Sequence, residues 1–340
     1  MLCSDNGPAR PIGARVQLQG DQKVLARRLD VRTAAAGLLA CGIITGLAVP
    51  SLTSLFAPYA LGALFLVVVF SLLPFASLPG TELVTFDPAV LRTVLWQQVV
   101  LPCIVIAVGI LAKFPDVVVS LMIVTACAGS LFASPALADL LNLDRRRALQ
   151  CMVLSTFVMP FSLFFFLGMF HGVNIYLNVE EYVRRTAIFL ATPFAIFLIY
   201  RFIASNLRAS ATMRVDAAAR WAAVLSLLVF GIGIMHAVAD ELRAHPMKVL
   251  FFLVIATTLC IGMLVLTTVV MYRFGLNEAL TGGIVSGFRN VGLGFALVGE
   301  MVGADLAVYV GVSMLPVFIA PVVIRLVSLT KPQFQYAVAG

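Results

Sequence analysis

The feature that most constrains this chain is a near-continuous series of apolar segments, each about as long as a lipid bilayer is thick. A helix needs about 20 apolar residues to cross the hydrocarbon core of a membrane. The segments lie at residues 34–54, 56–75, 93–112, 115–141, 148–170, 184–204, 219–240, 247–273, 278–302 and 304–328. This pattern predicts an all-α membrane protein with about ten transmembrane helices.

The composition argues against a soluble fold. Of 340 residues, 61% are hydrophobic and 11% are charged, whereas soluble domains carry about 25% charged residues. A surface with so little charge would expose large apolar patches to water. We therefore expect a lipid bilayer as the main partner of the chain.

Lysine and arginine residues gather in alternate segments between these spans. If the N-terminus is cytoplasmic, the inner segments hold Arg10, Arg15, Lys23, Arg27, Arg28, Arg32, Arg92, Arg145, Arg146, Arg147, Arg201, Arg208, Arg214, Arg220, Arg273, Arg325 and Lys331. The outer segments hold only Lys113, Arg184, Arg185, Arg243 and Lys248. The positive-inside rule then predicts a multi-pass protein of the cell inner membrane or plasma membrane with both termini cytoplasmic. The net charge of +7 reports this orientation and predicts no nucleic-acid partner.

The spans divide into two sets of five. A basic cytoplasmic tail, residues 1–33, precedes the first set at 34–170; the second set occupies 184–328, and a short tail, 329–340, follows. An odd number of helices in each set makes the two sets inverted relative to each other, as in many secondary transporters.

Both sets contain a polar, small-residue interruption in a span. The fourth span contains A-G-S-L-F-A-S-P at 128–135, and the ninth contains V-S-G-F-R-N-V-G-L-G at 285–294. Two broken helices in matching positions are a sequence indication of a binding site in an inverted-repeat transporter. Packing glycines between close helices are the alternative interpretation of Gly287, Gly292 and Gly294.

Arg289 stands near the middle of the ninth span, where a charge is costly and normally faces the protein interior. One interpretation is a fixed cation that attracts an anionic substrate or replaces a bound metal cation. The other is a structural arginine that is hydrogen-bonded to backbone groups.

Three stretches resemble the bile acid:sodium symporter family, of which the chain would be a divergent bacterial-type member. They are G-F-R-N-V-G-L-G-F-A-L at 287–297, the segment from A-G-S-L-F-A-S-P to S-T-F-V-M-P at 128–160, and Gln97 placed five residues before Pro102. The resemblance implies a core domain in which the broken fourth and ninth helices cross, and a panel domain. It also implies two sodium ions at the crossing and an organic anion between the domains.

The resemblance assigns site residues and shows where this chain departs from the family. It places the substrate at Ser130, Ser134, Arg289 and Asn290, and the ion site at Gln97, Ser134, Arg289 and Asn290. Family sodium ligands are replaced by Val285, Arg289, Pro135, Ala148 and Met152. Since a hard cation needs several oxygen ligands, sodium binding is doubtful. Our hypothesis is that the Arg289 guanidinium, hydrogen-bonded by Gln97, takes the place of one sodium ion.

The resulting prediction is a secondary transporter of a small organic anion that needs no sodium, with no resident cofactor, metal or protein partner. No catalytic motif points to an enzyme. An arsenite-type exporter of the same fold is an alternative, because Cys127 precedes the first break and a thiolate binds soft metalloids. A membrane sensor that binds an anion without moving it is another.

Overall fold

The computed structural model describes residues 41–76, 87–171, 178–207 and 209–330. All regular elements within these residues are helical. The first part of the predicted span 34–54 lies outside these residues. The predicted tail 1–33 and most of the tail 329–340 lie outside them as well.

Six helical stretches in the described part of the chain are long and apolar enough to cross a membrane. They are Ser51–Phe75, Pro88–Leu111, Arg145–Phe170, Val179–Ala204, Ser210–Ala244 and Pro246–Phe274. Each coincides with one of the spans predicted from the sequence. The chain is therefore an all-α, membrane-embedded protein.

Two of the remaining predicted spans are interrupted. The fourth consists of α7 (Asp116–Cys127) and α8 (Ser134–Leu140), and the ninth of α14 (Leu276–Gly287) and α15 (Val291–Val298). The last predicted span corresponds to the continuous helix α16 (Asp305–Thr330).

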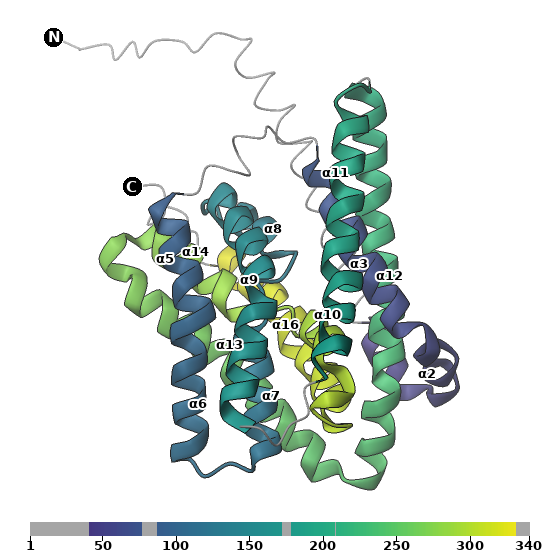
Figure 1. The fold of residues 1–340 in the computed structure, drawn as a ribbon, viewed down its shortest axis with the longest axis vertical. Coiled ribbons are helices and arrows are strands. Elements are labelled where there is room, and N and C mark those ends of the chain that lie inside the picture. Colours follow the sequence, from purple (N-terminus) through teal and green to yellow (C-terminus); the bar gives the residue numbers. More distant parts are fainter. Residues whose placement is uncertain (1–40, 77–86, 172–177, 208, 331–340) are drawn as a thin grey trace, which may run out of the picture.

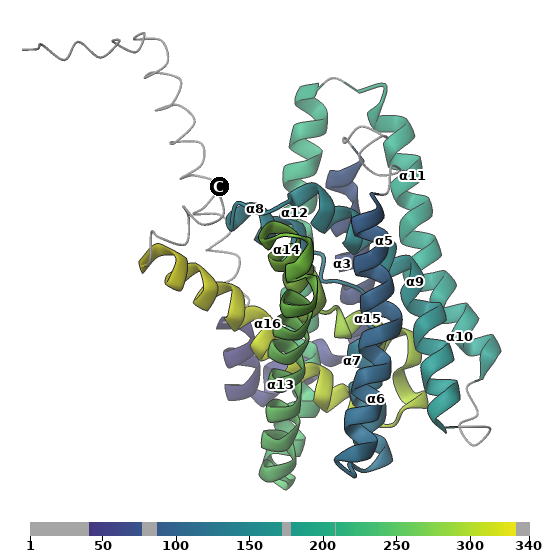
Figure 2. The ribbon, with the colours of Figure 1, turned by 90° about the vertical axis from the view of Figure 1, so that its left-hand side faces the viewer.

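Two groups of helices stand beside each other in Figure 1. The first contains α5 (Pro88–Leu95), α6 (Leu101–Leu111), α9 (Arg145–His171) and α13 (Pro246–Met271); the second contains α2 (Pro50–Phe56), α3 (Ala60–Leu72), α11 (Thr192–Ala204) and α12 (Ala209–Ala244). The short helix α10 (Val179–Thr186) leads into α11, and α12 packs along α3. In Figure 2, α14 runs beside α13, against which it packs closely.

Local capping explains where several helices begin. The Asp87 side chain accepts a hydrogen bond from the Ala89 backbone N–H at 3.1 Å, and Pro88 follows at the first helical position. Asn178 caps α10 in the same way through the Glu181 backbone N–H, at 3.2 Å. These are the residue types that helix N-termini prefer, because they satisfy N–H groups that have no partner inside the helix.

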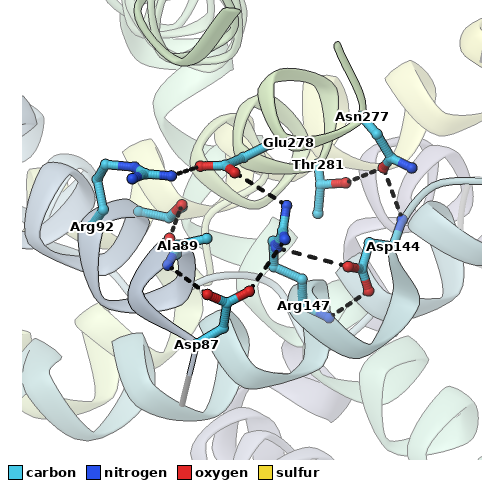
Figure 3. A network of polar contacts seen from close by, with 9 residues as sticks. Asp87, Ala89, Arg92, Asp144, Arg147, Asn277, Glu278 and Thr281 are labelled. Atoms are coloured by element: carbon cyan, nitrogen blue, oxygen red, sulfur yellow. Dashed lines mark hydrogen bonds and ion pairs between the residues drawn. The ribbon is translucent and has the colours of Figure 1, made fainter. Parts of the chain in front are cut away.

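A polar network ties together the first turns of α5, α9 and α14 (Figure 3). Glu278 forms ion pairs with Arg92 and, at 3.4 Å, with Arg147, while Arg147 also reaches Asp87 at 3.3 Å. The Glu278 side chain is 10% exposed, so its charge is largely removed from water and depends on both arginines. The network fixes α14, the first half of the broken ninth span, against the two neighbouring helices α5 and α9.

Candidate functional site

The two helix breaks lie against each other. Ser130 and Arg289 pair as an isolated antiparallel bridge. The Leu131 N–H donates to the Phe288 carbonyl at 2.9 Å, and the Asn290 N–H donates to the Gly129 carbonyl at 2.8 Å. Each break therefore provides hydrogen-bond partners for backbone groups of the other break. Backbone N–H and C=O groups that are buried away from water need such partners.

The first break also lies close to α9. A side chain at Gly129 would place its Cβ 3.0 Å from the Thr156 Cα and Oγ1 atoms, closer than such contacts usually are, so glycine makes this approach easier. The Ser130 N–H donates to the Ser155 hydroxyl at 3.0 Å, and the Ser130 hydroxyl donates to the Val285 carbonyl at 2.8 Å. Ser130 thus connects α9 with the end of α14.

The Arg289 guanidinium is buried at this junction, with 2% of the residue exposed. Its Nε donates to the Ser286 carbonyl at 2.8 Å, its Nη1 to the Ala128 carbonyl at 2.7 Å, and its Nη2 to the Gln97 carbonyl at 3.2 Å. No carboxylate among the described residues forms an ion pair with it. The cation is therefore held by backbone oxygens from three separate segments.

Two of these oxygens lie at the C-terminal ends of broken helices. Ala128 is the C-cap of α7, and Ser286 lies in the last turn of α14. Carbonyls at a helix C-terminus lack an intrahelical donor and carry the negative end of the helix dipole. Two such ends meeting at one point favour a cation there.

The third oxygen is freed by a local change of helix register. Residues Trp96–Val100 form a π-turn between α5 and α6, in which the Leu101 N–H donates to Trp96 instead of Gln97. Pro102, next in the chain, has no N–H to offer. The Gln97 carbonyl is therefore available to Arg289, and the Gln98 carbonyl accepts the Ser162 hydroxyl at 2.6 Å.

The predicted site residues come together only in part. Gln97 contacts Arg289 through its backbone carbonyl, while its side-chain amide donates to the Ser286 hydroxyl at 3.1 Å. Asn290 caps α15 through the Leu293 N–H at 3.2 Å. Ser134 begins α8, and its buried hydroxyl has no hydrogen-bond partner among the described residues.

The backbone partners of Arg289 match the second interpretation given from the sequence, a structural arginine hydrogen-bonded to backbone groups. Which carbonyls provide the contacts was not predicted. The oxygens of Ala128 and Ser286 belong to the backbone, which leaves no trace in residue type. Gln98, whose side chain is buried and donates to the Ala128 carbonyl at 3.4 Å, was also missed. Pro102 was the available signal, because a proline in a helix has no N–H for a carbonyl of the preceding turn, that of Gln98 in an α-helix and that of Gln97 in the π-turn found here.

Apolar packing fills the places where the family resemblance expects sodium ligands. Val285 and Ala148 are fully buried in one hydrophobic cluster with Cys151 and Phe288. The Met152 side chain is buried as well. None of these side chains carries an oxygen, so they offer nothing to a hard cation.

An apolar cavity of about 70 Å³ lies next to the first break, which contributes Phe132 to its wall. It is lined by Val68, Leu72, Phe75, Phe132, Met152, Val153, Thr156, Phe157, Leu190, Phe194 and Phe197. Phe132 belongs to the break itself, while the other residues come from α3 and the turn after it, α9, and α11 with the turn before it. The one hydroxyl on its wall, Thr156, donates to the Met152 carbonyl at 2.7 Å. The four predicted substrate residues lie outside this wall.

No protein-family model matches the chain, and no curated protein matches it in sequence. The likeness to the bile acid:sodium symporter family therefore rests on the three stretches of sequence alone.

Proposed function

We propose that the protein is a secondary transporter of a small organic anion, in which Arg289 is a built-in replacement for a coupling sodium ion. The observation that carries the proposal is the set of three backbone carbonyls around the buried guanidinium. Ends of discontinuous helices that offer carbonyl oxygens are how many transporters hold sodium. Here a covalently attached cation occupies such a site.

The proposal includes the finer architecture. It has ten spans in two inverted sets of five, with both termini cytoplasmic in the inner or plasma membrane. The meeting of the two broken helices supports this arrangement, since each break lies in the fourth span of its own set. In this arrangement α3, α11 and α12 belong to the panel, and α5, α6, α7, α9, α13 and α14 belong to the core.

The cavity next to the first break supports a carried ligand. It separates α9 from α3 and α11, where a panel and a core would meet. Its volume is well below the roughly 300–1,000 Å³ of typical ligand sites. A substrate would therefore require the two groups of helices to move apart, which is the motion that alternating access uses.

An arsenite-type exporter receives less support. Cys127, the thiol that suggested it, is completely buried at the end of α7 and does not line the cavity. We therefore propose organic anions as the substrates.

Thermal stability of the purified protein against a panel of small organic anions, in sodium and in choline buffer, tests the proposal. A ligand at a hundred times its dissociation constant adds about 2.7 kcal/mol to the free energy of unfolding. We expect one class of anions to stabilise the protein equally in both buffers. Stabilisation seen only in sodium would refute the role of Arg289.

A further inference from the structure

The chain enters the second group of helices through the short helix α10 and the π-turn Ala187–Ala191. α10 packs against α15, whereas α11, which follows the π-turn, packs against α3 of the second group. In Figure 1, α10 lies below α11 and leads into it. One unbroken helical stretch, Val179–Ala204, therefore has its two ends attached to different parts of the molecule.

Two side chains attach α10 to helices that adjoin the breaks. The Tyr182 hydroxyl donates to the Pro160 carbonyl of α9 at 2.6 Å, and the tyrosine is buried. The Arg185 guanidinium lies against Gly299 at the end of α15, where a Cβ would collide with it. A cation is favourable there, because a helix C-terminus carries the negative end of the helix dipole. α10 is thus fixed to α9 and α15.

The attachment to the second group begins only a few residues later. Phe189, in the π-turn, packs edge-to-face on Phe65 of α3, with ring centroids 6.3 Å apart. Phe197 of α11 is buried and lines the cavity together with residues of α3. The boundary between the two attachments therefore falls between Arg185 and Phe189, at the start of the π-turn.

The backbone of this boundary is weakened as a helix. The Thr192 N–H donates to the Ala187 carbonyl instead of the Ile188 carbonyl, and Pro193 has no N–H to offer to the preceding turn. Sharp bends in helices occur almost always at prolines, at π-bulges or at similar interruptions. Here a π-turn and a proline stand together, so the helix bends easily at this point.

The other π-turn, Trp96–Val100, shows how such a site is held rigid. Pro102 follows it in the same position, and the freed Gln97 carbonyl is bound by the Arg289 guanidinium. In the described part of the chain, no charged side chain binds a carbonyl of Ala187–Ala191. The second π-turn therefore has the same construction without the group that locks the first.

The connection from α12 back to α13 is also held by charges. Glu241 and Lys248 form an ion pair at 3.0 Å across the turn, and Lys248 also pairs with Asp305 of α16 at 2.7 Å. His245, in the turn itself, lies 3.1 Å from the same Glu241 carboxylate. Of these two connections, the π-turn after α10 is the one that bends more easily.

We propose that α10 moves as one body with α9 and α15, and that the start of the π-turn Ala187–Ala191 is the hinge about which α11 and the second group turn. The inference deepens the proposed function, because it identifies the joint that alternating access uses. It rests on that function only for the purpose of the motion; the motion itself is measurable without transport.

Distances between pairs of spin labels test the hinge. The labels are attached to cysteines introduced into the full-length protein, after its native cysteines have been replaced by alanine, and the distances are measured by pulsed EPR in lipid nanodiscs. Four exposed positions serve as labelling sites: Val183 on α10, Phe202 on α11, Leu95 on α5 of the first group and Leu225 on α12 of the second.

The two labels on α10 and α11 should behave in opposite ways. Val183 should keep one narrow distance to Leu95, and Phe202 one narrow distance to Leu225. Between Ala187 and Phe202 the helix rises about 22 Å. A bend of about 20°, the lower limit for a sharp kink, displaces Phe202 by about 8 Å, so its distances to Leu95 should spread over about that range. The distances from Val183 to Leu225 should spread as well.

Two variants test the parts of the hinge. Pro193→Ala restores the missing N–H and should narrow the Phe202–Leu95 distribution. Its matched control is Pro246→Ala, because Pro246 occupies the first position of α13, where an N–H has no partner inside the helix. Tyr182→Phe removes the bond to α9 and should broaden the Val183–Leu95 distribution, which is narrow in the wild type.

Three results would overturn the proposal. A broad Val183–Leu95 distribution beside a narrow Val183–Leu225 distribution would mean that α10 belongs to the second group. Four narrow distributions would mean that the stretch does not bend. An unchanged Phe202–Leu95 spread in Pro193→Ala would place the hinge elsewhere. Failure of the proposed function is a separate outcome, because a protein with the expected distances and no flux in proteoliposomes bends without transporting.

Discussion

Arg289→Ala should destabilise the protein and at the same time create a sodium dependence that the wild type lacks. The substitution removes the donors of three buried carbonyls, those of Ser286, Ala128 and Gln97. Each carbonyl left without a donor costs about 1–3 kcal/mol. Relief of the buried charge offsets part of this, so we expect a net loss of about 3 kcal/mol.

Sodium should restore most of that loss. The alanine leaves room for an ion among the three carbonyls, and an ion at a hundred times its dissociation constant adds about 2.7 kcal/mol. Arg289→Met is the matched control, because methionine fills the space and offers neither donors nor room for a cation. It should be destabilised and insensitive to sodium.

Thermal unfolding in detergent, in sodium chloride and in choline chloride, measures both effects. In choline, the midpoint of Arg289→Ala should lie about 5 °C below that of the wild type. Arg184→Ala should shift little, since the side chain of Arg184 is 67% exposed. Sodium that stabilises the wild type but not Arg289→Ala would refute the idea that Arg289 occupies a cation site.

Three further predictions concern the surroundings of the site. Glu278→Gln should lower the free energy of unfolding by about 1–3 kcal/mol, and with it the thermal midpoint, because Arg92 and Arg147 lose a shared, largely buried partner. The control is Glu180→Gln at an exposed position, and equal midpoint shifts in the two variants would contradict the reasoning. Gly129→Ala should cost about 1–3 kcal/mol, because its Cβ would press on Thr156, whereas Gly168→Ala, where a Cβ meets open space, should be neutral. The pKa of Asp87 is lowered by the hydrogen bond from the Ala89 backbone N–H and by Arg147 and Arg92, against a smaller opposing effect of burial. Its charge therefore stabilises the fold above the unfolded pKa of about 4. This stabilisation disappears as the pH falls through the lower pKa of the folded state. Wild type and Asp87→Asn should therefore differ by less than about 1 kcal/mol at pH 7, since the carboxylate is half exposed, and should converge in strongly acidic buffer; a gap that widens on acidification would contradict this.

The membrane fold was predictable because it follows from the length of the apolar segments in the sequence. Each of the six long helical stretches coincides with an apolar segment that the bilayer requires. The breaks were predictable for a related reason. Residues such as Gly129, Ser130 and Pro135 interrupt an otherwise apolar run, and the structure ends α7 at Cys127 and resumes with α8 at Ser134.

The chemistry inside the site was less accessible. Sequence indicated that Arg289 is buried, because a charge in mid-membrane must face the protein. It offered backbone groups as possible partners but did not indicate which ones, because the availability of a carbonyl depends on helix ends and on a π-turn. Gln97 was expected to hydrogen-bond Arg289, and it does so through its backbone carbonyl, while its side-chain amide donates to the Ser286 hydroxyl.

Flux measured in proteoliposomes shows whether the protein transports an anion and whether Arg289 makes that transport independent of sodium. The anion that stabilises the purified protein most would be loaded on one side, with sodium or choline as the only external cation. We expect the wild type to take up the anion at the same rate in both buffers, and Arg289→Ala to transport it faster in sodium than in choline. Uptake by the wild type that requires sodium, or binding with no uptake at all, would contradict it.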